Sequence, residues 1–69
     1  MTNPKEESDF NNGVIWAVAR IVELHDEPTV AADVLRESGI HIDMRKIDEA
    51  DRPFIKTIMQ ELYFRKVKQ

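Results

Sequence analysis

The stretch Gly13–Asp26, GVIWAVARIVELHD, is the most apolar run in the chain and predicts its central helix. Successive residues of a helix lie about 100° apart. This spacing puts six apolar side chains on one face: Val14, Ile15, Val18, Ala19, Ile21 and Val22. Ala17 and Leu24 widen the face to about 220°, roughly twice the stripe of an ordinary surface helix. A helix this apolar is normally covered on two sides, so the stretch predicts the centre of an all-α domain.

Polar residues set the expected ends of this helix at about 11 and 26. Asn11 or Asn12 is a candidate N-cap, because its side-chain oxygen can accept a hydrogen bond from a first-turn N–H. Pro28 ends the helix, since its ring disfavours an α conformation at the residue before it. Residues 1–9, MTNPKEESD, have no apolar periodicity and predict a flexible N-terminal arm. Residues 10–69 are then a single helical domain.

Two further helices are predicted after the central one. Residues 29–38 place Val30, Ala31, Val34 and Leu35 on one face, and Gly39 supplies the left-handed residue that commonly follows a helix. Residues 52–66 follow Asp51 as N-cap, with Pro53 in the first turn, where its missing N–H is harmless. The apolar face of this last helix contains Phe54, Ile55, Ile58, Met59, Leu62 and Tyr63.

Residues 40–51 leave three possibilities open: a loop, a helical turn or an edge strand. Asp43 can cap one helical turn near 43–48, whereas Ile40 to Ile42 can be extended. A lone strand would need a partner chain to pair with. We therefore favour a loop with one helical turn. The expected architecture is a compact three-helix domain with this possible extra turn.

The size and composition of the chain favour a small protein that is stabilised by association with another chain. The chain has 69 residues and no cysteine, so it cannot form a disulfide, and its core is marginal for a lone domain. Oligomerisation is the remaining common means of stabilisation, and most homo-oligomers are two-fold dimers. No apolar run is long enough to span a membrane, and the polar N-terminus lacks the features of a signal peptide. We expect a cytoplasmic location.

Two aromatic residues lie on the expected polar faces. Trp16 falls between Arg20 and Glu23 on the central helix, and Phe64 groups with polar residues on the last one. The Trp16 ring could lie flat over a neighbouring segment, or it could anchor a partner, since Trp is enriched at interface hot spots. Trp16, Arg20, Glu23 and Phe64 are therefore the candidate protein-interface residues. Together with the over-wide apolar face of residues 14–24, they predict a homodimer that forms through the central helix and acts by binding another protein.

The charge is unevenly distributed and suggests an alternative partner. Residues 1–51 carry 12 acidic and 5 basic side chains, a net charge of −7, whereas residues 52–69 carry 1 acidic and 5 basic, a net charge of +4. The possible nucleic-acid contacts are Arg52, Lys56, Arg65 and Lys66. The same cations also suit the C-terminal end of a helix dipole. Residues 29–39 loosely resemble the start of a helix-turn-helix, but four acidic residues in 42–51 would repel phosphate, which makes nucleic acid the less favoured partner.

No motif in the sequence predicts a catalytic, metal-binding or nucleotide-binding site. The two histidines, His25 and His41, lack the i, i+4 spacing of two metal ligands on one helix face. Neither serine has an evident neighbouring base, and the two glycines form no phosphate-binding loop. We expect no enzyme activity, no cofactor and no metal. The sequence thus favours a non-enzymatic regulator or inhibitor, of the size of small proteins from bacteria or their phages, with a DNA-associated transcriptional regulator as the alternative.

Overall fold

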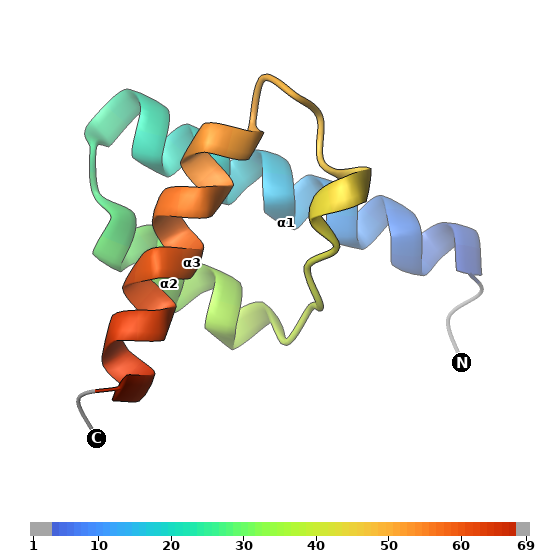
Figure 1. The fold of residues 1–69 in the computed structure, drawn as a ribbon. Helices are drawn as coiled ribbons and strands as arrows, with labels where there is room; N and C mark the ends of the chain where they lie inside the picture. Colours follow the sequence, from blue (N-terminus) through green and yellow to red (C-terminus); the bar gives the residue numbers. More distant parts are fainter. Residues whose placement is uncertain (1–3, 68–69) are drawn as a thin grey trace.

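The computed structural model describes residues 4–67, and these fold into three α-helices and one short 3-10 turn (Figure 1). The elements, in chain order, are α1 (Pro4–His25), α2 (Pro28–Ser38), η1 (Met44–Lys46) and α3 (Arg52–Val67). Each α-helix contacts the other two. The predicted all-α, three-helix domain is confirmed, and the bounds of the second and third helices agree with the expectation to within a residue.

The first helix is longer than predicted, because it begins at Pro4 instead of near residue 11. Asn11 and Asn12 therefore lie inside α1, and their predicted capping role is wrong. Proline fits the first position of a helix, and acidic Glu6 and Glu7 in the first turn complement the helix dipole. A polar segment can thus continue a helix without apolar periodicity. Residues 4–9 are helical, residues 1–3 lie outside the described part, and the mobility of this arm stays a prediction.

The connections between the helices follow from single residues. Pro28 opens α2 at its first position, which leaves Glu27 at the N-cap position. Gly39 ends α2 with φ of +72°, and its N–H donates to the Arg36 carbonyl at 3.2 Å, as the left-handed cap predicts. The third helix begins directly after Asp51, as predicted. The Asp51 carbonyl accepts hydrogen bonds from the N–H groups of Phe54 and Ile55 in the first turn of α3.

The segment between α2 and α3 is a loop around one helical turn, the arrangement that we favoured. The Asp43 carboxylate accepts from the Arg45 N–H at 3.0 Å and caps η1. No strand forms at residues 40–51. Ile47 is buried, and Ile40, Ile42 and Met44 are packed against the core, so this loop covers one side of the molecule.

The core lies where the three helices meet. Within the described residues it consists of nine buried apolar side chains: Val18, Ala19, Val22, Ala31, Ala32, Leu35, Ile47, Ile55 and Ile58. Val14, Ile15 and Ile21 pack against it from α1. The broad apolar face of α1 is thus largely covered by its own chain, and only Trp16 and Leu24 remain strongly exposed on that stretch, at 59% and 68%. The surplus apolar surface that predicted a dimer through this helix is correspondingly small.

The helices within residues 4–67 are not long and apolar enough to cross a membrane.

Candidate protein-binding groove

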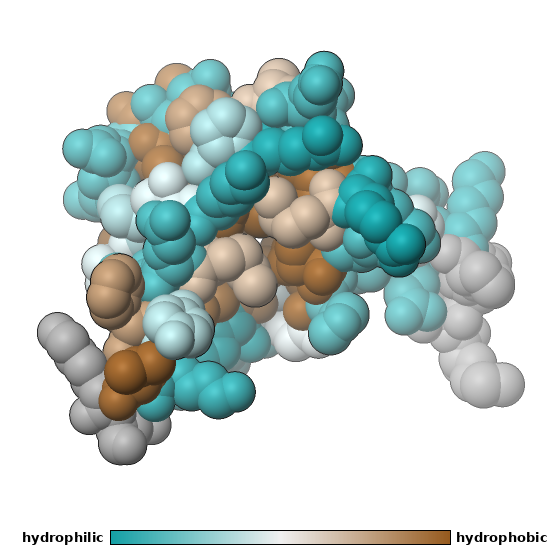
Figure 2. All heavy atoms as spheres, viewed as in Figure 1, coloured by the Kyte–Doolittle hydropathy of each residue, from teal (hydrophilic) through white to brown (hydrophobic). Residues whose placement is uncertain are grey.

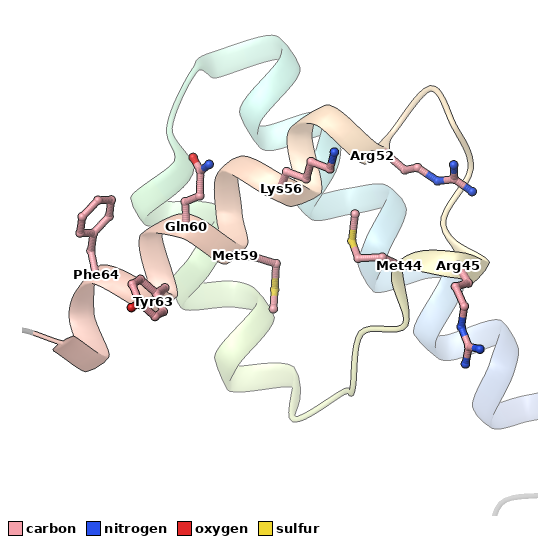
Figure 3. Close-up of a pocket in the computed structure, with 8 residues that line it drawn as sticks. All are labelled: Met44, Arg45, Arg52, Lys56, Met59, Gln60, Tyr63 and Phe64. Carbon is pink, nitrogen blue, oxygen red and sulfur yellow. The ribbon is translucent and has the colours of Figure 1, made fainter.

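A groove lies between η1 and the outward face of α3 (Figure 3). Its volume is about 960 Å³. Eight residues line it: Met44, Arg45, Arg52, Lys56, Met59, Gln60, Tyr63 and Phe64. On α3 the lining residues recur three to four positions apart, which places them along one face of the helix. The groove therefore runs lengthwise along α3, with η1 forming one wall.

The apolar part of the groove comes from Met44, Met59, Tyr63 and Phe64. The rings of Tyr63 and Phe64 lie 6.4 Å apart in an edge-to-face arrangement. Tyr63 is 65% exposed and Phe64 is 60% exposed, so both rings present most of their surface to solvent. Methionine side chains adapt their shape to an apolar partner. Figure 2 shows apolar surface, coloured brown, between α3 and the η1 loop and again near the C-terminal end of α3.

The charged part of the groove is entirely basic. Arg45 forms an ion pair with Asp43 at 3.1 Å, but its side chain remains 89% exposed. The Arg52 Nε donates to the Ile47 carbonyl at 3.0 Å, a bond that leaves its charge unneutralised. Lys56 makes no ion pair within residues 4–67. None of the lining residues is acidic, so the rim carries a positive potential over an apolar floor.

The predicted protein-interface residues do not form one surface. Trp16 is exposed on α1, whereas Phe64 lies in the groove near the end of α3. Arg20 is held by contacts within its own chain: its guanidinium lies 5.6 Å from the Trp16 ring centroid and forms an ion pair with Asp51. Its Nε is 3.0 Å from Glu23 Oε1, close enough for an ion pair although not aligned for a hydrogen bond. Arg20 therefore joins α1 to the start of α3, and Glu23 pairs with Arg20 within α1.

The four cations proposed for nucleic acid are also divided. Arg52 and Lys56 line the groove, and Lys66 is exposed near the end of α3. Arg65 points to α2 instead, where it bonds to Asp33 at 2.7 Å and to the Thr29 carbonyl at 3.0 Å. Two of the four cations, Arg52 and Lys56, thus lie together. The charge of Arg65 is already paired with Asp33, so Arg65 is not available for phosphate.

Sequence reasoning missed the outward position of Met59 and Tyr63. Both were assigned to the covered face of α3, yet they are 40% and 65% exposed. The covered stripe is centred on Ile55 and Ile58 and continues through the half-buried Leu62. The apolar arc of α3 is wider than the short α2 can cover. This difference in width is the feature of the sequence that could have indicated exposed apolar side chains on α3.

Within residues 4–67, no cluster of three or more His, Asp or Glu side chains could hold a metal ion, and the sequence has no cysteine. Arg45 lowers the pKa of Asp43, because its side chain and its backbone N–H both donate to that carboxylate. Asp43 is thereby fixed as an anion that caps η1. No family model, curated protein or solved structure matches this chain.

Proposed function

We propose that this chain is a small, non-enzymatic protein-interaction module, which acts as a regulator or inhibitor by binding an acidic, amphipathic helix of another chain. The proposal depends on one observation: the groove joins an apolar floor to Arg52 and Lys56, which form no ion pair within residues 4–67, and no carboxylate lines it. An apolar floor selects an apolar helix face, as in other helix-in-groove recognition. A positive rim selects acidic neighbours and speeds their encounter.

The occupant can be described further from the layout of the groove. Arg52 and Lys56 lie toward the start of α3, and Tyr63 and Phe64 lie toward its end (Figure 3). The twelve-residue step from Arg52 to Phe64 corresponds to a rise of about 18 Å along the helix axis. The groove thus suits about three turns of a helix with acids at one end and apolar residues at the other.

Nucleic acid has weaker support as a partner. Arg52 and Lys56 are adjacent, but phosphate binding generally needs several cations along one track. Here Arg65 is paired with Asp33 and Glu61, and the floor beside Lys56 is apolar. A DNA-associated regulator is the alternative function, and binding experiments with a peptide and with duplex DNA distinguish it from the protein-interaction module.

The test is a titration of the ¹⁵N-labelled chain with a synthetic amphipathic helical peptide that carries glutamates beside an apolar face. We expect shift changes at Lys56, Met59 and Tyr63, and no binding of the same peptide with lysines in place of glutamates. Lys56→Glu and Tyr63→Ser should weaken binding. Leu24→Ser removes a side chain that is 68% exposed at the far end of α1, so it is the matched control.

Two results would overturn the proposal. One is the absence of shift changes in the groove with either peptide. The other is a chain that does not bind the acidic peptide but binds duplex DNA, with an affinity that falls steeply with salt and is lost in Lys56→Glu. That result would establish the DNA-associated regulator.

A further inference from the structure

The first turns of α1 extend beyond the core, and Glu7 and Ser8 border a shallow pocket that they share with the loop around η1. Residues 5–10, which we call the tip, are all exposed, and they extend past the loop that carries η1 (Figure 1). The tip contains the acidic residues Glu7 and Asp9, and neither forms an ion pair within residues 4–67. It ends in Phe10, whose side chain is 56% exposed. The tip is thus a short helix with acidic groups next to an exposed aromatic ring.

We infer that the tip of one copy of this chain binds in the groove of a second copy. This inference rests on the proposed function, because it names the chain that supplies the acidic helix. The tip offers carboxylates and an aromatic ring, and the groove offers cations and an apolar floor. The same complementarity holds for larger parts of the chain: residues 1–51 have a net charge of −7 and residues 52–69 a net charge of +4.

The spacing of the residues fixes the direction of the tip in the groove. Phe10 follows Glu7 by three positions, and Met59 follows Lys56 by three positions. Both steps rise about 4.5 Å along a helix axis. With Glu7 beside Lys56, Phe10 therefore reaches Met59 and the ring of Tyr63. The tip then runs in the same direction as α3 of the second copy.

The tip cannot make this contact within its own chain. It is part of the continuous helix α1, and Val18 and Val22 fix the middle of that helix in the core. Bringing Phe10 to its own Tyr63 would require the helix to break. Two copies that exchange their tips reciprocally form a closed, two-fold pair, which makes each contact twice.

The charges allow a direct test by exchange. Glu7→Lys places a cation opposite Lys56 of the second copy, and Lys56→Glu places a carboxylate opposite Glu7, so each variant alone has like charges at this contact. Sedimentation velocity should show concentration-dependent dimers for the unaltered chain and about tenfold weaker association for each variant alone. An equal mixture of the two variants should associate again, because both of its contacts join opposite charges.

Glu37→Lys is the matched control, since Glu37 is exposed on α2 and the charge change is the same as at Glu7. It should associate like the unaltered chain. Circular dichroism of every variant confirms that the helices remain. Equal association of all the variants, or a mixture that associates no better than its components, would overturn the inference.

A second experiment locates the contact. The chain has no cysteine, so Ser8→Cys provides a unique site in the tip for a nitroxide spin label. Mixed with ¹⁵N-labelled unaltered chain, the labelled copy should broaden the amide signals of residues 56–64. A label on Glu37→Cys should leave those signals sharp. Broadening that is absent, or that falls only outside residues 56–64, would contradict the inferred contact.

The inference and the proposed function fail differently. If the acidic peptide shifts the groove resonances while the chain sediments as a monomer of 8.1 kDa at every concentration, the groove has another partner and only the inference is wrong. If neither the peptide nor a second copy reaches the groove, both are wrong.

Discussion

The guanidinium of Arg20 on α1 donates a hydrogen bond to the carboxylate of Asp51, the residue directly before α3. The two side chains are 22% and 13% exposed, so the ion pair is partly buried. The same guanidinium lies 5.6 Å from the Trp16 ring centroid and 6.0 Å from that of Phe54. Arg20 therefore joins the middle of α1 to the start of α3 through both charge and ring contacts.

Arg20→Ala should destabilise the fold, because it leaves Asp51 partly buried without its cation. We expect a loss of about 2 kcal/mol in the free energy of unfolding, between the values for exposed and buried pairs. For a domain of this size, that corresponds to a fall of about 10 °C in Tm. Urea denaturation followed by circular dichroism measures the loss.

Arg36→Ala is the control for this prediction. Arg36 is exposed on α2 and forms no ion pair within residues 4–67, so its removal should change the free energy of unfolding by about 0.5 kcal/mol or less. Equal effects of the two substitutions would show that the Arg20–Asp51 pair adds nothing to stability.

Local rules were sufficient where one residue determines the backbone. Gly39 predicts the end of α2, because the left-handed conformation is open to glycine, and Pro28 predicts the α1–α2 boundary. The start of α1 escaped the same reasoning. Apolar periodicity reports which face is covered, and the exposed tip has no covered face, so its helix left no periodic signal.

The groove could be predicted only in part. The sequence placed Phe64 outside and Arg52 with Lys56 on α3, and all three line the groove. It could not place Met44 beside them, since that contact joins η1 to α3 through tertiary packing. A helical wheel gives the angle between residues but not the width of the surface that neighbouring helices cover. Met59 was for this reason assigned to the wrong side.

The two glycines should respond to alanine with opposite signs. Gly39 has φ of +72°, a conformation that is strained for alanine, so Gly39→Ala should cost about 1 kcal/mol of stability. Gly13 lies in the middle of α1, and a Cβ there meets nothing within 4 Å. Gly13→Ala should therefore add about 0.5–1 kcal/mol, the difference in helix propensity. Urea denaturation of both variants is the measurement, and a gain at Gly39 would contradict the helix end described here.

A chain that lacks residues 1–9 should still fold. The side chains of residues 5–9 are exposed and belong to none of the core contacts. We expect the free energy of unfolding to change by about 1 kcal/mol or less. The far-ultraviolet circular dichroism signal should decrease, since helical residues are removed.

Ile58→Ala calibrates this prediction, because Ile58 is fully buried and its truncation should cost about 3 kcal/mol. A truncated chain as unstable as Ile58→Ala would show that the tip contributes to the core.

The Asp43–Arg45 contact should be visible in a titration of the Asp43 carboxyl group. Arg45 donates to the two carboxylate oxygens from Nε and Nη2, both at 3.1 Å, and these bonds lower the pKa of Asp43 in the folded chain. Arg45→Gln should raise that pKa toward the ordinary value for aspartate, about 4. The ¹³Cγ shift of Asp43, followed by NMR from neutral to acidic pH, gives the pKa in each protein.

The sign of the pH effect follows from the direction of the shift. A pKa that is lower in the folded state than in the unfolded state favours folding above the ordinary aspartate pKa, and the contribution is lost as pH falls through the folded value. Arg45→Gln should therefore weaken the loss of stability below about pH 4 that comes from this residue. Arg36→Gln removes an exposed arginine that is not among the charges acting on Asp43, so it should leave the Asp43 titration unchanged. Identical titrations of Asp43 in the unaltered chain and in Arg45→Gln would rule out the Arg45 side chain as the main cause of its low pKa.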